Sequence, residues 1–202
     1  MEFFGFNLID FVKTAGYLGL FGVVFAETGL FLGFFLPGDS LLFVAGFLAS
    51  QGFLNIGVLL MVLFVAAVTG NILGYAFGYK IGPAIFDKED SLLFKKSHVK
   101  KAQTFYDIYG GKVIMIARFI PVVRTFAPIL AGVAKMHRPT FLMYNIAGAL
   151  VWTLLLTLLG YWLGTSIPNV DRYLLPIVGV IIIASILPGV IGYMREKKKL
   201  QQ

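Results

Sequence analysis

The chain has 202 residues, of which 58% are hydrophobic and only 13% are charged, and its formal net charge is +7. This composition excludes an ordinary soluble domain of this length and is typical of an all-α integral membrane protein with several spans. The absence of cysteine excludes disulfide bonds and thiolate metal sites, and the two histidines lack a nearby carboxylate pattern, so we expect no metal site and no cofactor.

The first apolar run, 17–36, is long enough to cross a bilayer, which takes about 20 residues. Two acids, Glu2 and Asp10, precede the run, and no small-residue cleavage motif follows it, so a secretory signal peptide is not expected. Charge does not decide whether 17–50 forms a hairpin or adds a crossing. The orientation of the N-terminus therefore stays open.

The first run ends in the sequence FLPGDS. We expect Pro37 and Gly38 to break the helix there, and the acid Asp39 follows directly. The next run, 53–79, predicts a transmembrane helix. From Gly70, near the end of this run, to Gly82, every fourth residue is a glycine. This spacing indicates close helix packing, either within the chain or between two copies.

Basic residues gather in three blocks that flank the apolar runs, a pattern typical of membrane proteins and not of nucleic-acid binding. One block is the loop 83–112, the second holds Lys135 and Arg138, and the third is the C-terminal tail. By the positive-inside rule all three are cytoplasmic. Within the loop, 97–110 predicts an amphipathic interfacial helix that binds anionic phospholipids, with a solvated basic loop as the alternative.

The run 113–134 lies between two cytoplasmic blocks, so it must enter and leave the membrane on one side as a re-entrant hairpin. Pro121 and Pro128 should break its helix, because each removes a backbone donor. Such a break survives at membrane depth only where protein or a watery cavity covers it. The runs 141–164 and 172–194 then predict two spans, which leaves the C-terminus cytoplasmic.

The chain also repeats itself. The order Phe-Leu-Pro, Ala-Gly and Gly-Tyr-x-x-Gly recurs as Phe-Ile-Pro, Ala-Gly and Gly-Tyr-x-x-Gly, with 41 residues from Pro37 to Gly78 and 39 from Pro121 to Gly160. An odd number of crossings between the copies makes them inverted repeats, whose helix breaks indicate a transport site near the midplane. We expect a single domain over 1–202, with repeats at about 17–82 and 113–164.

Four ionisable residues lie at membrane depth or at its edge: Glu27, Asp39, Arg118 and Arg124. Each would cost about 2.5–3.5 kcal/mol at the bilayer centre, so they must face each other, water or a ligand. The acids could simply neutralise the arginines. Alternatively, the planar guanidinium groups bind a phosphate, and the acids act as counter-ions that respond to protons. The two interpretations are compatible.

The string RFIPVVRTFAPILAG, together with FLPGDS, GNILGYAFGYKIG and GYWLG, resembles the DedA family of bacterial membrane proteins, which are related to the VTT-domain lipid scramblases. The resemblance covers about 15–165. It implies two oppositely facing re-entrant hairpins packed among transmembrane helices, in the cytoplasmic membrane. It also implies that Glu27 and Asp39 are the family's required acids and that Arg118 and Arg124 are its required arginines.

On this basis we expect translocation of a lipid phosphate, with undecaprenyl phosphate as the expected lipid, coupled to the proton motive force and supporting cell-envelope synthesis. A broad phospholipid scramblase and a proton- or sodium-coupled exporter of small solutes are the alternatives. A lipid phosphatase is not expected, because His98 and His137 form no nucleophile set. The sequence leaves open the lipid, the coupling ion, the direction of transport and the oligomeric state.

Overall fold

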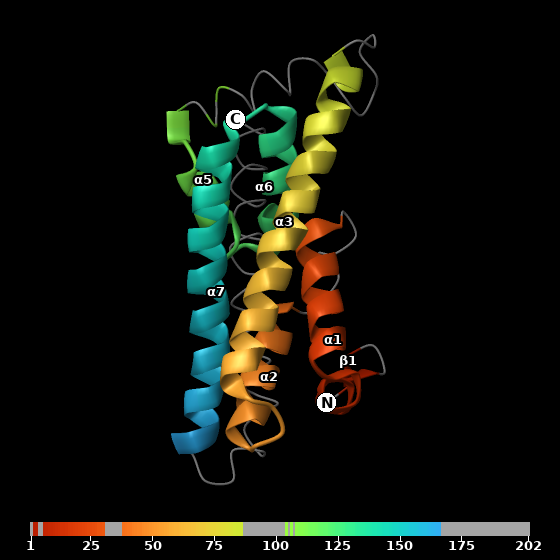
Figure 1. The fold of residues 1–202 in the computed structure, drawn as a ribbon, viewed down its shortest axis with the longest axis vertical. Helices are drawn as coiled ribbons and strands as arrows, with labels where there is room; N and C mark the ends of the chain where they lie inside the picture. The colour runs from red at the N-terminus through yellow and green to blue at the C-terminus, as the bar shows by residue number, and fades with distance from the viewer. Residues whose placement is uncertain are drawn as a thin grey trace, which may run out of the picture. The chain divides into compact units, whose positions relative to one another are not determined.

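The computed structural model describes residues 2–3, 6–30, 38–86, 104, 106 and 108–166. Over this part of the chain the structure is helical, apart from two antiparallel strands of two residues each, β1 (Glu2–Phe3) and β2 (Phe6–Asn7). The helices are α1 (Leu8–Gly29), α2 (Gly38–Ser50), α3 (Ile56–Phe86), α5 (Lys112–Ala117), α6 (Pro121–Val133) and α7 (Arg138–Ser166) (Figure 1). The predicted span 172–194, Pro37 and most of the predicted interfacial helix lie outside the described residues.

Three of these helices are long and apolar enough to cross a membrane: Ile9–Gly29, Ile56–Ile81 and Arg138–Ser166. The second and third confirm the predicted helices at 53–79 and 141–164. The first begins earlier than the predicted run, and it contains a kink at Gly16, whose positive φ of 55° suits glycine. The coarse prediction of an all-α membrane protein is therefore confirmed.

The apolar run around the two arginines is interrupted, as its prolines indicated. Helix α5 ends at Ala117 and α6 begins at Pro121, and the two short helices contact each other. The prediction that Pro128 also breaks the helix is wrong, because α6 continues through it. Pro128 is buried and its ring lies against the bare backbone of Gly74 on α3, so the proline fills a packing position.

The chain divides into two compact units, each drawn from several parts of the sequence. The first unit combines Met1–Val23, Leu36–Val65 and Trp152–Gln202, and the second combines Val24–Phe35 and Ala66–Val151. Each unit contains residues of both predicted repeats, 17–82 and 113–164, so the units do not coincide with the repeats. The single domain over 1–202 stays a prediction.

In the first unit α2 packs against the second half of α7. An added methyl group at Gly46 would overlap the Thr157 backbone, and one at Gly160 would overlap the Phe43 backbone. Residues 40–49 of α2 are all buried, which is typical of an apolar helix covered on every side by protein. With 13 residues, α2 is about 20 Å long, too short to cross a bilayer core of about 30 Å.

In the second unit α6 packs against α3 through an equivalent pair of glycines. A methyl group at Gly132 would overlap the backbone at Tyr75, and one at Gly78 would overlap the backbone of Ile129. Further along α3, Gly70 lies against Gly29 of α1. Gly70, Gly74 and Gly78 of this series therefore serve packing within the chain, where they bring both α1 and α6 close to α3.

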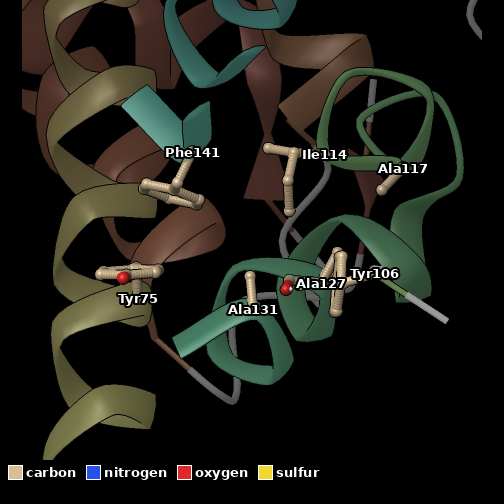
Figure 2. Packing of buried hydrophobic residues seen from close by; sticks show 7 residues of the cluster. All are labelled: Tyr75, Tyr106, Ile114, Ala117, Ala127, Ala131 and Phe141. Carbon is tan, nitrogen blue, oxygen red and sulfur yellow. Dashed lines mark hydrogen bonds between the residues drawn. The ribbon is translucent and has the colours of Figure 1, made fainter. Parts of the chain in front are cut away.

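A small core closes the second unit between α3, α5, α6 and the start of α7. Figure 2 shows the rings of Tyr75 and Phe141 facing each other, with their centroids 4.3 Å apart, and Tyr106 beside Ala127 of α6. Ile114 and Ala117 add the apolar face of α5. This core holds the interrupted segment, and with it both arginines, in place.

Candidate functional site

Glu27 and Arg124 form a buried ion pair in the second unit. The Oε1 atom of Glu27 lies 2.5 Å from Nη2 of Arg124, and the two side chains are 0% and 2% exposed. Glu27 comes from the last turn of α1 and Arg124 from the first turn of α6, where its backbone N–H donates to Ile120. The helix interruption before Pro121 thus aims this arginine at α1.

Arg118 occupies the interruption itself, directly after α5, and is only 1% exposed. Its Nη2 atom donates to the side-chain oxygen of Asn145 on α7 at 2.6 Å and to the carbonyl of Ala67 on α3 at 3.1 Å. These acceptors are neutral. Arg118 therefore has a different environment from Arg124, although the charges of Arg124 and Glu27 both act on it.

Two donors of Arg118 have no acceptor. Its Nε and Nη1 atoms are buried and make no hydrogen bond, although a buried donor without a partner costs free energy, more so when it carries charge. Among the described residues of this unit Glu27 is the only acid, so the cluster of Glu27, Arg118 and Arg124 carries one excess positive charge. This arrangement suits an anion with several acceptor oxygens.

Two asparagines within the apolar helices hold Arg118 from the side. Asn145 accepts from Arg118 and from Nδ2 of Asn71 at 3.0 Å, while its own Nδ2 donates to the carbonyl of Val68 at 3.1 Å. The Asn71 amide can instead turn, so that its oxygen accepts from Arg118 and its nitrogen donates to the carbonyl of Thr28. Neither asparagine was predicted from the sequence, although an amide well inside an apolar span is a usable signal.

Gly148 gives the Arg118 side chain its room. A methyl group there would lie 3.2 Å from Cδ of Arg118 and 3.4 Å from Nε, closer than most real contacts. The glycine therefore lies next to Nε, one of the two donor atoms without an acceptor.

Asp39, the fourth predicted charge, belongs to the first unit. It lies in the first turn of α2, and its Oδ1 atom accepts from Nε1 of Trp152 on α7 at 2.9 Å. Trp152 is 1% exposed, so the bond is sheltered from solvent. Trp152 is not among the site residues predicted from the sequence. Gly38, expected as part of a helix break, is the first residue of α2.

Tyr106, a helical residue ahead of α5 in the chain, supports α6. Its hydroxyl donates to the carbonyl of Ala127 at 2.7 Å. Burial raises the pKa of the Tyr106 phenol, so the group stays protonated and keeps donating at neutral pH. Of the other described residues of the predicted interfacial helix, Thr104, Ile108 and Tyr109 are exposed and Gly110 is half-buried.

Comparison with known proteins gives a consistent result. The VTT domain matches residues 36–162, which is more than half of the chain. The chain is 47% identical over 198 residues to Protein DedA of Escherichia coli (strain K12), covering 95% of this chain and 90% of that protein. It is 42% identical over 200 residues to an uncharacterized membrane protein of Mycobacterium tuberculosis (strain H37Rv), covering 94% and 87%. It is 33% identical over 150 residues to Inner membrane protein YqjA of Escherichia coli (strain K12), covering 74% and 68%. No solved structure matches the chain at a significant level.

Proposed function

The chain belongs to the DedA family of VTT-domain membrane proteins, and we propose that it translocates a lipid phosphate across the bacterial cytoplasmic membrane. The observation that carries this proposal is Arg118, which is buried in the membrane protein with two unused donors and no carboxylate of its own. Undecaprenyl phosphate is the substrate that we propose, and envelope synthesis is the process that its return to the inner leaflet would support.

The phosphate would bind beside Arg118. Its oxygens would accept from Nη1 or from Nε, which point to different sides of the guanidinium, and its charge offsets the excess positive charge of the cluster. Arg124 would contribute through its charge, while Glu27 keeps it oriented. The prenyl tail would stay in lipid, so the protein needs to shelter only the headgroup.

Protons would drive the exchange of partners. If Glu27 takes up a proton, Arg124 loses its carboxylate partner and becomes a second cation for the phosphate; loss of the proton restores the pair and weakens phosphate binding. Asp39, sheltered by Trp152, is a second proton acceptor in the other unit. This scheme uses no covalent intermediate, so we propose a transporter and not an enzyme. Sodium remains the alternative coupling ion.

The proposed architecture is a pair of inverted repeats, each with a re-entrant hairpin. The packing of glycines supports this repeat: Gly46 and Gly160 join α2 to α7 in the same way as Gly132 and Gly78 join α6 to α3. In both units a 13-residue helix that is too short to span packs on a helix that is long enough. The hairpins would be buried in protein, as broken backbone at membrane depth requires. We place the C-terminus in the cytoplasm.

A leaflet assay tests the proposal. Purified protein is reconstituted into vesicles with a fluorescent prenyl phosphate, and the fraction in the outer leaflet is followed with a membrane-impermeant quencher, with and without a proton gradient. We expect Arg118→Ala and Arg124→Ala to abolish the protein-dependent rate, while Lys112→Ala, which removes an exposed cation of α5, keeps it. Unchanged rates in both arginine variants would refute the proposal. Equal movement of a phosphatidylcholine probe would indicate a broad scramblase instead.

A further inference from the structure

A pocket lies in the second unit between the end of α3 and the start of α7. It has a volume of about 290 Å³ and shares no residue with the cluster around Arg118. The two helices run antiparallel and side by side here (Figure 1). The pocket therefore offers a binding surface that the proposed translocation site does not use.

The inner wall of the pocket is aromatic. Tyr75 stacks on Phe141 with ring centroids 4.3 Å apart and on Tyr79 at 6.0 Å. The Tyr75 hydroxyl donates to the carbonyl of Met136 at 2.6 Å, and the buried ring forms the base of the pocket. This wall suits a hydrocarbon chain.

One end of the pocket carries two cations, Lys80 and Arg138. The Arg138 guanidinium lies 4.8 Å from the centre of the Tyr79 ring, which holds it over the pocket. Both side chains are exposed, and no carboxylate of the described residues pairs with either of them. This end suits a negatively charged group.

The pocket crosses the level where headgroups meet hydrocarbon. Lys80 lies next to the end of the apolar span Ile56–Ile81, and Arg138 begins the span of α7. Ile72 lies about 12 Å deeper along α3 than Lys80, and both Ile72 and Leu142 are partly exposed on the outer surface. The cations thus lie at headgroup level, and the exposed Ile72 and Leu142 lie at the level of the acyl chains.

We propose that this pocket binds one anionic phospholipid of the surrounding leaflet. Its headgroup phosphate lies between Lys80 and Arg138, and the upper part of one acyl chain lies against Ile72, Leu142 and the half-buried Tyr79. A pocket of this size holds only part of a lipid, so the remaining chain stays in the bilayer. The lipid would join α3 to α7 next to the Asn71–Asn145 bond that supports Arg118.

Native mass spectrometry of the full chain tests this site. The protein is released from nanodiscs that contain equal amounts of phosphatidylglycerol and phosphatidylcholine, and the lipid retained on the protein is identified. We expect retained phosphatidylglycerol to exceed phosphatidylcholine, and Lys80→Gln with Arg138→Gln to reduce that preference by about tenfold. Lys112→Gln, which removes an exposed charge outside the pocket, should leave the preference unchanged.

A second variant tests the acyl-chain half of the site. Ala76→Trp fills the pocket from its wall while both cations remain, and it should lower the amount of retained lipid in a protein whose helix content by circular dichroism is unchanged. Equal retention of both lipids by the wild type, or an unchanged preference in the double variant, would overturn the proposal. Full retention in Ala76→Trp would overturn the acyl-chain placement. Arg118 and Arg124 are intact throughout, so the result does not depend on the translocation assay.

Discussion

Arg118 and Asn145 are joined by a hydrogen bond of 2.6 Å from Nη2 to Oδ1, and the amide leaves the arginine's charge unneutralised. Arg124, six residues later, has a carboxylate partner in Glu27. The two arginines of one short segment therefore differ: one is paired, and the other is held by neutral acceptors with two donors unused. This asymmetry is what a site for a transient anion needs.

Replacing Asn145 by aspartate should inactivate the protein without unfolding it. Asn145→Asp puts a carboxylate where the amide oxygen already accepts from Arg118, so it neutralises the excess charge that we assign to the phosphate. We expect the translocation rate in the leaflet assay to fall by at least about tenfold, because a permanent counter-ion competes with the ligand. Asn145→Ser is the matched control without charge. If Asn145→Asp transports at the wild-type rate, the excess charge has no role.

The Glu27–Arg124 pair should show strong coupling in stability. Glu27→Gln leaves a buried guanidinium without its carboxylate, and breaking such a pair costs about 3–5 kcal/mol. Thermal unfolding in detergent should therefore show a large loss for Glu27→Gln and for Arg124→Gln, and a smaller loss for the double variant than for the sum. Additive losses would mean that the two side chains do not stabilise one another.

The two glycine contacts should respond alike to alanine. Gly46→Ala and Gly132→Ala place a methyl group against helix backbone, which cannot move aside as a side chain can. We expect each to destabilise the protein by about 1–3 kcal/mol, measured by thermal unfolding. Gly22→Ala on α1 is the control, because nothing lies within 4 Å of the added methyl group, and it should be neutral or stabilising. A harmless Gly46→Ala beside a severe Gly132→Ala would argue against equivalent repeats.

Asp39 can be tested with its hydrogen bond intact. Asp39→Asn keeps an oxygen that accepts from Trp152 but removes the exchangeable proton, so the fold should survive. We expect translocation in the variant to lose its response to an imposed proton gradient. Trp152→Phe is the complementary change: it removes the donor, keeps the carboxylate, and should lower the midpoint of thermal unfolding. A gradient response that persists in Asp39→Asn would exclude this carboxylate from proton coupling.

The sequence predicted those features that follow from apolar length and from proline. The runs 53–79 and 141–164 appear as α3 and α7, and the segment around the arginines is interrupted before Pro121. Pro128 was misjudged because a proline also fits a helix whose neighbour, Gly74, leaves room for the ring. That tolerance depends on a contact between distant segments, which local sequence does not report.

The charged residues of the candidate site were predicted from the sequence, but the contacts between them were not. The free-energy cost of a charge in the bilayer led to the prediction of Glu27, Arg118 and Arg124 as site residues, and the structure brings them together. Their spacing in the sequence does not indicate that Glu27 pairs with Arg124 and not with Arg118. Asn71 and Asn145 were not predicted, because an amide carries no charge and costs less free energy to bury than an ionised group does. In the sequence, Trp152 is not distinguished from other aromatic residues of the apolar runs. Only the packing of α2 against α7 brings Asp39 to its indole N–H.

The most direct test of the account is the binding of a phosphate at Arg118. A water-soluble, short-chain prenyl monophosphate is titrated into the detergent-solubilised protein by isothermal calorimetry, beside the corresponding prenyl alcohol. We predict saturable binding of the phosphate by the wild type and by Lys112→Ala, at least about tenfold weaker binding by Arg118→Ala, and no measurable binding of the alcohol. Equal affinity of the wild type and Arg118→Ala for the phosphate would contradict the account.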